Sequence, residues 1–258
     1  ENPLRIDVDP PRQAEAIGLL DVFVGIDLFR GFSLGRAREI LQVARSVHYT
    51  AGAMIIKEGS LGDAFYIIKS GVASVRSGGE EIKRYQAGDY FGETALIRNK
   101  PRNADVVAQT DLNLVEIDRY DFLYLLRGTD ISVRLLRLAQ MREERSWDLF
   151  RTNTALNLLT SAQKTQLQSF MDVVETKEGD LLWTSGEAAG AAYLIDEGRV
   201  ALEGYSDGLR PYGSASFLGE IDAIVSGGAT TGSARVVEAG RVFCLTRTDL
   251  VRWFDENP

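Results

Sequence analysis

Cysteine and histidine are almost absent from the sequence, which contains only Cys244 and His48. A single cysteine cannot form an intramolecular disulfide, so we expect a protein of the reducing cytoplasm. Metal-binding β-barrels of the cupin type need a cluster of histidines, and Ser-His-Asp or Cys-His catalysis needs a histidine base. No nucleophile-elbow motif accompanies His48. We therefore expect His48 to be a half-exposed strand residue, and we expect no catalytic residues and no metal site.

Long apolar runs and an excess of positive charge are also missing. The sequence has no run of about 18 apolar residues and no basic-then-apolar leader, so neither a membrane span nor a signal peptide is expected. The 37 acidic side chains outnumber the 29 lysines and arginines, which gives a net charge of −8. This charge argues against nonspecific binding to nucleic acid or to an anionic membrane. Residues 1–13 read as a linker.

Two different apolar periods alternate along the chain. Residues 14–30 and 33–47 carry apolar side chains at helical spacing, and Ser33 is a suitable N-cap for the second helix. Short β-branched or aromatic segments then alternate with glycine turns, which predicts strands over residues 54–56, 64–68, 72–75, 106–108 and 112–117. Many short strands punctuated in this way indicate a β-roll or a jelly-roll-like barrel. A long amphipathic helix is predicted over residues 131–150.

The glycine turns recur at a fixed offset. Gly92 and Gly219 differ by 127 (219 − 92), as do Glu93 and Glu220 and the glycines at 52 and 179, 59 and 186, and 71 and 198. A repeat of this length indicates two copies of one domain. We therefore predict an α+β fold with two tandem β-roll domains, each flanked by helices, over residues 14–150 and 151–258. In the second copy, helices are predicted over residues 156–174 and 249–254, with strands over 181–183, 192–195, 200–202, 234–237 and 242–245.

One stretch in the first copy has the features of a cradle for an anion. Gly92 lets the backbone approach a ligand, and a helix-forming run begins directly after it, so free backbone amides would face a negative charge. Arg102 follows nine positions after Glu93 (102 − 93) and offers a planar fork of donors for two phosphate oxygens. A carboxylate beside a phosphate is explained if it accepts hydrogen bonds from ligand hydroxyls, as an acidic residue does for ribose. These residues predict a nucleotide site.

The string FGETALIRNKPRNADV, residues 91–106, resembles the phosphate-binding cassette of cyclic nucleotide-binding domains. That family includes protein kinase A regulatory subunits, the bacterial catabolite activator protein and cyclic nucleotide-gated channels. The resemblance implies that the backbone amides of Gly92 and Ala104 face the cyclic phosphate. It also implies that Arg102 pairs with the exocyclic oxygens and that Glu93 holds the ribose 2′-hydroxyl. The implied ligand-binding set is Gly92, Glu93, Thr94, Ala95, Arg102, Asn103, Ala104 and Trp147.

The same resemblance implies a lid, a base selector and a relay. Trp147 lies 45 positions past Arg102 (147 − 102), close to where the bacterial activator's helix meets the base; a place in an interdomain core is the alternative. At position 103 the kinase regulatory subunits generally carry alanine and cGMP-preferring kinases carry threonine. Asn103 departs from both, and its side chain could either satisfy a guanine or face water; cAMP is the expected ligand and cGMP the alternative. Leu96 would relay occupancy to a hinge near Phe122.

The second copy lacks the arginine. Aligning residues 106–107 with residues 236–237, a shift of 130, places Gly232 opposite Arg102 and implies a loop longer by three residues (130 − 127). Losing a charge-assisted pair costs roughly 1.5–3 kcal/mol or more. We therefore predict that this site binds cyclic nucleotide weakly or not at all and that Arg235 faces solvent. The second domain would be a structural or partner-facing module, or would hold a different small ligand.

These features predict a cyclic nucleotide sensor and regulatory protein rather than an enzyme, with no cofactor besides its ligand. Ligand binding would move the helix over residues 131–150 and so act on an unidentified effector protein or domain. The Leu-Ala-Gln-Met run at 138–141 resembles the dimer helix of the bacterial activator, which makes a homodimer through this helix one option.

Three alternatives stay open. A kinase regulatory subunit with a preference for cGMP or another purine nucleotide fits the resemblance, although no Arg-Arg-X-Ser/Ala-like inhibitor segment is present. A transcription regulator would need a helix-turn-helix after the long helix, where a second β domain follows instead. A β-barrel enzyme would need histidine clusters or paired catalytic carboxylates.

Overall fold

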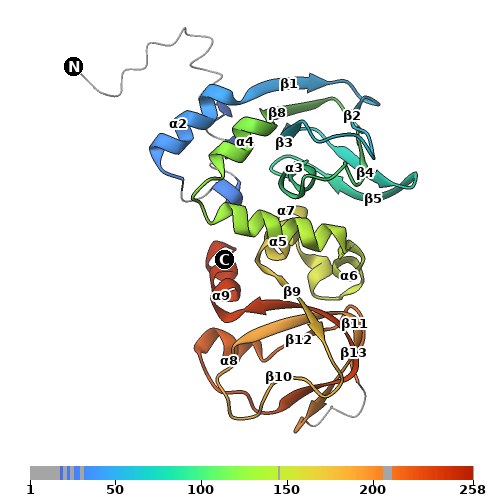
Figure 1. Ribbon diagram of the computed structural model, residues 1–258, viewed down its shortest axis with the longest axis vertical. Coiled ribbons are helices and arrows are strands. Elements are labelled where there is room, and N and C mark those ends of the chain that lie inside the picture. Colours follow the sequence, from blue (N-terminus) through green and yellow to red (C-terminus); the bar gives the residue numbers. More distant parts are fainter. Residues whose placement is uncertain are drawn as a thin grey trace, which may run out of the picture. The chain divides into compact units, whose positions relative to one another are not determined.

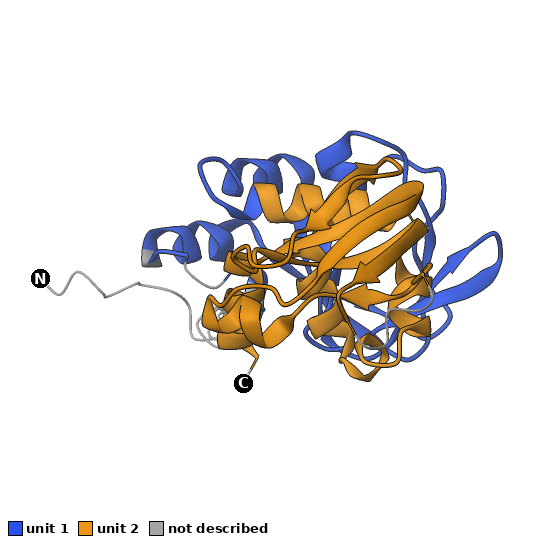
Figure 2. Ribbon diagram, turned by 90° about the horizontal axis from the view of Figure 1, so that it is seen from below, with its two compact units in different colours: residues 1–132 blue, residues 133–258 orange. Residues whose placement is uncertain are grey.

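A computed structural model describes residues 18–19, 22–23, 26–29, 32–144, 146–205 and 211–257. The chain divides into two compact units, residues 1–132 and 133–258 (Figure 2). Each unit combines antiparallel strands with flanking helices (Figure 1). The predicted α+β class and the tandem arrangement are therefore confirmed. The linker predicted over residues 1–13 lies outside the described residues.

The first unit contains two four-stranded antiparallel sheets, with strand orders β1-β8-β3-β6 and β2-β7-β4-β5. The central strand β3 is buried along its first five residues, so its side chains face apolar surroundings on both sides. Tyr66 and Ile68 belong to the core between the sheets, whereas Phe65 stacks on Phe122, with ring centroids 4.4 Å apart. The strands are β1 (Arg45–Tyr49), β2 (Met54–Ile56), β3 (Ala64–Ser70), β4 (Ala73–Ser77), β5 (Glu80–Tyr85), β6 (Tyr90–Phe91), β7 (Asp105–Ala108) and β8 (Leu112–Asp118).

All five strands predicted for this unit are confirmed, with ends that differ by a few residues, and three others were missed. β5 is mostly charged and exposed, and β6 has only two residues, so neither carries an apolar pattern. β1 was assigned to a helix predicted over residues 33–47, which is wrong beyond residue 43. Side chains of β1 alternate in burial, and Val47 and Tyr49 pack on the core, so pairing with β8 decides the structure there. His48 is an exposed strand residue, bonded through Nδ1 to Asn113 Oδ1 at 3.0 Å.

The helices of the first unit are η1 (Asp27–Phe29), α2 (Leu34–Val43), α3 (Glu93–Arg98) and α4 (Arg119–Leu125). Ser33 caps α2 as predicted, because its hydroxyl accepts from the amide of Arg36 at 3.3 Å. The helix predicted over residues 14–30 is described only in part. Residues 18–19 and 22–23 are helical, and residues 26–29 include η1; the remaining residues lie outside the described ranges.

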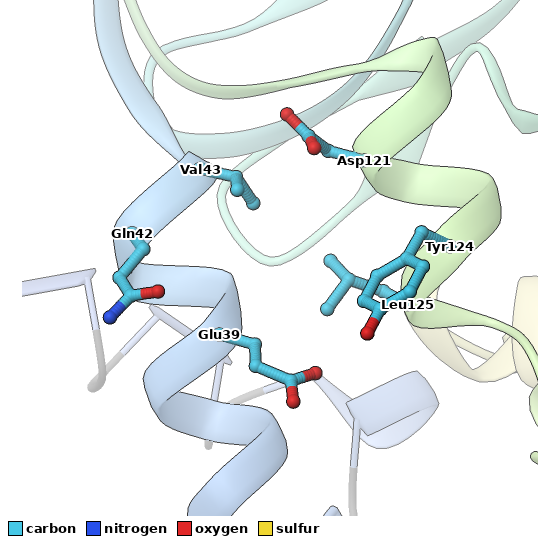
Figure 3. A pocket seen from close by; sticks show the side chains of 6 residues that line it. All are labelled: Glu39, Gln42, Val43, Asp121, Tyr124 and Leu125. Carbon is cyan, nitrogen blue, oxygen red and sulfur yellow. The ribbon is translucent and has the colours of Figure 1, made fainter.

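Between α2 and α4 lies a pocket of about 240 Å³ (Figure 3). Its lining contains two carboxylates, which oppose binding of an anion, and contains none of the predicted nucleotide-binding residues. The lining residues are Glu39, Gln42, Val43, Asp121, Tyr124 and Leu125.

The second unit contains one five-stranded sheet, in which β10, β13, β11 and β12 follow one another and β9 also pairs with β13. The strands predicted over 192–195 and 200–202 form one strand, and those over 234–237 and 242–245 form another. Register shifts near Gly198, whose φ is +87°, let pairing continue where a turn was expected. The strands are β9 (Asp172–Thr176), β10 (Leu181–Trp183), β11 (Ala191–Glu203), β12 (Phe217–Leu218) and β13 (Ser233–Thr246).

The single helix predicted over residues 131–150 is wrong, because α5 ends at Glu143 and α6 begins at Trp147. Buried Ser146 donates through its hydroxyl to the carbonyl of Met141 at 2.7 Å and accepts from Gln168 Nε2 at 3.0 Å, so its side chain ties the last turn of α5 to α7. The helix predicted over 156–174 also ends early, at Phe170. The helices are α5 (Ile131–Glu143), α6 (Trp147–Thr152), η2 (Leu156–Leu158), α7 (Ser161–Phe170), α8 (Ile221–Ser226) and α9 (Arg247–Glu256).

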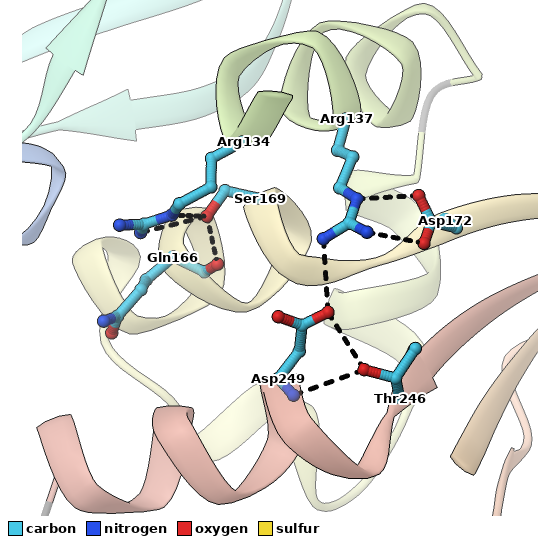
Figure 4. Close-up of polar contacts among 7 residues, drawn as sticks. All are labelled: Arg134, Arg137, Gln166, Ser169, Asp172, Thr246 and Asp249. Atoms are coloured by element: carbon cyan, nitrogen blue, oxygen red, sulfur yellow. Dashed lines mark hydrogen bonds and ion pairs between the residues drawn. The ribbon is translucent and has the colours of Figure 1, made fainter. Parts of the chain in front are cut away.

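Arg137 on α5 ties three elements of the second unit together (Figure 4). Its Nε and Nη2 donate to the two carboxylate oxygens of Asp172 at 2.7 and 2.8 Å, and its Nη1 lies 3.2 Å from Asp249 Oδ2. Met141 and Phe150 belong to the core cluster of the same unit. Most of α5 is therefore part of the second unit. The boundary between residues 150 and 151, predicted from the sequence repeat, stays a prediction.

We expect Arg137→Ala to destabilise the second unit by about 1–2 kcal/mol, because a bidentate, partly buried ion pair is lost. All three tryptophans, Trp147, Trp183 and Trp253, lie in this unit, so denaturant unfolding followed by tryptophan fluorescence reports on it alone. Arg151→Ala is the control, because its pair with Asp148 is exposed on both sides and is expected to contribute less than about 0.5 kcal/mol. Equal losses in the two variants would contradict this role of Arg137.

Candidate functional site

Gly92 shapes the corner where the predicted cassette begins. β6 pairs with β3 through Tyr66 and Phe91, and the chain then turns into α3 through Gly92, whose φ is +93°. A Cβ atom at Gly92 would lie 2.8 Å from Arg102 Nη1 and 2.9 Å from the carbonyl oxygen of Ala64. Both the backbone angle and the crowding therefore require glycine at this position.

Arg102 lies inside this corner, with only 3% of its side chain exposed. Its Nη1 donates to the carbonyl of Gly92 at 2.7 Å, and its Nη2 donates to the carbonyl of Ala64 at 2.8 Å and to Asp63 Oδ1 at 3.1 Å. Three of the five guanidinium N–H donors are used in these bonds, so the group retains donors for an anion. Asp63 and Ala64 were missed as functional positions, although an acidic residue directly before a buried strand was visible in the sequence.

The first turn of α3 is buried. Glu93 is completely covered, and its Oε1 accepts from the hydroxyl of Thr94 at 2.6 Å. Ala95 lies so close to Gly62 that a Cβ atom at Gly62 would be 2.9 Å from the Cβ of Ala95. The helix therefore packs directly on the segment that leads into β3, and this contact fixes its first turn at the corner.

Arg102, Asn103 and Ala104 alternate in burial as the chain enters β7. Arg102 and Ala104 are buried, at 4% and 8% exposure, while Asn103 is exposed. Residues 103 and 104 form a bend before β7 begins at Asp105, and this bend leaves the asparagine exposed between the two buried side chains. The structure thus gathers Gly92, Glu93 and Arg102 at one corner of the first unit, and buried Ala104 follows two residues after the arginine.

The predicted relay residues lie in α3 and in α4. Leu96 and Phe122 are both buried, at 1% exposure. Arg119, a residue that sequence reasoning missed, donates through Nη2 to Asn99 Oδ1 at 2.7 Å and through Nη1 to the carbonyl of Gly62 at 3.3 Å. Asn99 is the C-cap of α3, so Arg119 links this helix to the start of α4. A relay through Leu96 and Phe122 stays a prediction.

Trp147 lies in the second unit, at the start of α6. Its ring is half-buried, and the guanidinium of Arg142 lies 6.0 Å from the ring centroid. The predicted role of Trp147 as a lid over the nucleotide base stays a prediction.

Thr230 occupies the place of Arg102 in the second copy, so the predicted match with Gly232 is wrong. The amide of Gly59 donates to the carbonyl of Arg102, and in the second copy the amide of Gly186 donates to the carbonyl of Thr230, both at 2.8 Å. The amide of Arg102 donates to the carbonyl of Ser60, and the amide of Thr230 donates to the carbonyl of Glu187. In the same way, the amide of Ala108 donates to the carbonyl of Ala53, and the amide of Val236 donates to the carbonyl of Asp180. These bonds match a shift of 128 (230 − 102), so the loop is longer by one residue (128 − 127), not three.

The additional residue lies at the start of α8. α3 begins with Glu93, directly after Gly92, whereas α8 begins with Ile221, two residues after Gly219. Glu220 therefore precedes its helix, while Glu93 is part of its helix. The two Val-Val pairs that guided the alignment do not correspond, because sheet pairing rather than residue type sets the register.

The corresponding corner of the second copy also lacks a carboxylate at the position of Asp63. The amide of Arg119 donates to the carbonyl of Asp63, and the amide of Arg247 donates to the carbonyl of Gly190, so Gly190 takes the place of Asp63. The hydroxyl of Thr230 donates to the carbonyl of Thr184 at 2.6 Å. Arg235 pairs with Glu203 at 2.8 Å, with 40% of its side chain exposed, as expected for a surface residue.

Glu220 accepts several hydrogen bonds from its own unit. Its Oε1 accepts from the hydroxyl of Tyr205 at 2.5 Å and from the amides of Thr231 and Gly232 at 2.6 and 3.4 Å, and its Oε2 accepts from the hydroxyl of Thr231 at 3.2 Å. Burial alone would raise the pKa of Glu220, but these hydrogen bonds outweigh it and lower the pKa. Burial and the neighbouring carboxylate raise the pKa of Tyr205, to which Trp183 Nε1 donates at 3.1 Å.

The described ranges contain neither a membrane-spanning helix nor a cluster of metal-binding side chains. Among those residues, no helix has both the length and the apolar content needed to cross a membrane. No group of three or more histidine, cysteine, aspartate or glutamate side chains in the same ranges could hold a metal ion.

The cyclic nucleotide-binding domain family matches residues 46–129 and 173–257 of the chain. The chain is 34% identical over 258 residues to the cGMP-dependent 3′,5′-cGMP phosphodiesterase A of Dictyostelium discoideum, covering 99% of this chain and 30% of that protein. It is 26% identical over 238 residues to the cAMP-dependent protein kinase regulatory subunit of Blastocladiella emersonii, covering 85% of this chain and 56% of that protein. The chain thus spans about a third of the first relative and about half of the second.

Among solved structures, the chain is similar to the regulatory domain of Toxoplasma gondii PKA with cAMP. The sequences are 20% identical, the TM-score is 0.47, and the match covers 96% of this chain and 94% of that one.

We expect Gly92→Ala to destabilise the first unit by about 2–3 kcal/mol, because a Cβ adds a collision with Arg102 to the cost of a positive φ. Gly88→Ala is the matched control. Its φ is +89° and a Cβ there has open space around it, so it should cost only about 1 kcal/mol. Scanning calorimetry measures the unfolding of both variants. Tryptophan fluorescence identifies the transition of the second unit, so the other calorimetric transition belongs to the first unit. Equal costs would show that the corner can relax around a methyl group.

We expect Glu220→Gln to destabilise the second unit at neutral pH but not in acid. The pKa of Glu220 in the folded chain is below its ordinary value of 4.5, so ionisation contributes stability above that value. This contribution is lost as the pH falls through the folded-state pKa, where wild type and variant should converge. Urea unfolding followed by tryptophan fluorescence at pH 7 and in steps down to about pH 3 measures the difference. A difference that stays constant over this range would contradict the lowered pKa.

Proposed function

The chain belongs to the cyclic nucleotide-binding domain family, and we propose that it is the sensor part of a larger regulatory protein whose first copy binds a 3′,5′-cyclic nucleotide. The observation that carries this proposal is the buried guanidinium of Arg102 beside Gly92 and Glu93. A guanidinium with unused donors attracts a phosphate, while a carboxylate next to it accepts from hydroxyl groups. A cyclic nucleotide presents both groups side by side.

Each residue of the corner has a distinct part in this proposal. Arg102 pairs with the exocyclic phosphate oxygens, and the amides of Gly92 and Ala104 donate to the same phosphate. Glu93 accepts from the ribose 2′-hydroxyl, while Thr94 holds the carboxylate of Glu93 through its hydroxyl. Because the guanidinium is nearly covered, the corner must open locally to admit the ligand. The free energy of that opening reduces the affinity.

Ligand binding would be transmitted through α3. One end of this helix carries Glu93 at the corner, and the other end is held by the bond between Arg119 and Asn99. A phosphate that draws Arg102 from the carbonyl of Gly92 changes the contacts of the first turn, and the helix passes the change to α4. The ligand can shift this equilibrium only by its difference in affinity for the two states.

The expected ligand is cAMP, and cGMP is the second candidate. Asn103 lacks the threonine hydroxyl that cGMP-preferring kinases offer to guanine, but it also differs from the alanine of the cAMP-binding kinase subunits, so it favours cAMP only through the missing hydroxyl. The relative that aligns with 99% of this chain is described as cGMP-dependent, which supports the alternative. The effector would be a catalytic part, because the named relatives are a phosphodiesterase and a regulatory subunit of a kinase. The chain itself would be regulatory and cytoplasmic, and would not be catalytic.

We expect Arg102→Ala to weaken nucleotide binding at least about 100-fold, because the charge-assisted pair with the phosphate is lost. Arg102→Lys should fall between this variant and wild type, since an ammonium cannot form the bidentate pair. Arg76→Ala, which removes an exposed arginine on β4, should bind like wild type. Calorimetric titration of the full chain with cAMP and with cGMP measures all four proteins.

Undiminished affinity of Arg102→Ala would refute the proposal. Tighter binding of cGMP than of cAMP by the wild-type chain would select the second candidate and leave the sensor function in place.

A further inference from the structure

The corner of the second copy is filled by side chains of that copy. At the shift of 128, Thr231 takes the place of Asn103 and Gly232 takes the place of Ala104. In the first copy, the amide of Ala104 is the proposed donor to the ligand phosphate. In the second copy, the corresponding amide of Gly232 donates to Glu220, and the preceding amide, that of Thr231, makes the shorter bond to the same carboxylate oxygen.

The one-residue insertion explains how a carboxylate reaches these amides. Glu93 is the first residue of α3, and its side chain is completely buried. Glu220 lies one position before α8, as its N-cap residue, and directs its side chain to residues 231–232 instead of capping the helix. A negative oxygen held by successive backbone amides is the arrangement by which proteins bind phosphate.

Two aromatic residues close the same corner. The hydroxyl of Tyr205 donates to Glu220, and Trp183 donates to that hydroxyl in turn. A Cβ atom at Gly232 would collide with the ring of Tyr205 and would lie 2.5 Å from the carbonyl oxygen of Glu203. Glycine at 232 therefore permits Tyr205 to lie against the loop that carries the two amides.

We propose that the carboxylate of Glu220 takes the place of the nucleotide phosphate in the second copy, so that this copy carries its own anion and excludes a phosphate ligand. The inference rests on the proposed function in one respect, namely that the Ala104 amide faces the phosphate in the first copy. In the second copy, Thr230 cannot pair with a phosphate as a guanidinium would, and the amides of Thr231 and Gly232 already donate to Glu220. The negative charge of Glu220 also repels a phosphate. Glu220 is thus a specificity-determining residue of the second copy.

This inference differs from simple loss of the arginine. If only the cation were missing, Thr230→Arg would restore binding by itself. If Glu220 holds the amides, the new guanidinium would pair with Glu220, and the phosphate would still be excluded. Removing Glu220 together with the Thr230 substitution frees the amides and removes the like charge.

The experiment uses the full chain in an Arg102→Ala background, so that the second copy alone is measured. Three variants are titrated with cAMP by calorimetry: Thr230→Arg, Thr230→Arg with Glu220→Ala, and Thr230→Arg with Glu203→Ala. Glu203 is the matched control, because it is a nearby carboxylate that pairs with Arg235 and lies outside the amide loop. Tryptophan fluorescence first establishes that the second unit of each variant is folded.

We expect only the variant with Glu220→Ala to bind cAMP, at least about tenfold more tightly than the other two. Equal binding by all three variants would overturn the inference, and so would failure of the Glu220→Ala variant to bind. A wild-type chain that binds no nucleotide would refute the proposed function of the first copy, a result that is separate from the comparison among the three variants.

Discussion

The first unit depends on one buried cation. Burying the guanidinium of Arg102 would be costly without acceptors, and the carbonyls of Gly92 and Ala64 with the carboxylate of Asp63 supply them. These bonds join the start of β3 to the turn before α3, so the same contacts that stabilise the corner also place a positive charge there. Gly92 follows from this arrangement, because a side chain at that position would displace the guanidinium.

The two copies share a scaffold and differ at this corner. Arg119 and Arg247 correspond at the shift of 128, and both hold the end of the short helix that follows the corner: Arg119 through Asn99 and Arg247 through the carbonyl of Ile224 at 2.7 Å. The cation and its acidic partner are both replaced in the second copy, while the surrounding backbone hydrogen bonds of the turns and loops are kept. A common fold therefore does not imply a common ligand, because binding is decided by a few side chains placed on it.

The family membership and the geometry are the basis of the proposed regulatory role. The chain aligns with only part of each named relative, so these relatives contain further segments on which a sensor domain could act. Short elements suit such a module. α3 has six residues and few backbone bonds of its own, so its position depends on the packing of its buried residues 93–96 and on the bond between Arg119 and Asn99. In the proposed mechanism, a ligand at Arg102 acts on this helix through the first of these contacts.

The sequence by itself determined the two copies, most of the strands and the residues of the first corner, because glycine spacing and apolar period report local backbone requirements. It could not determine the partner of Arg102, the start of β1, the interruption before Trp147 or the match of Thr230 with Arg102. Each of these depends on groups far apart in the chain: Asp63 is 39 residues from Arg102, and Ser146 meets Gln168 on another helix. Sheet register and side-chain bonds of this range are settled only when the elements pack, since a shift of one residue changes the pairing without changing the local pattern.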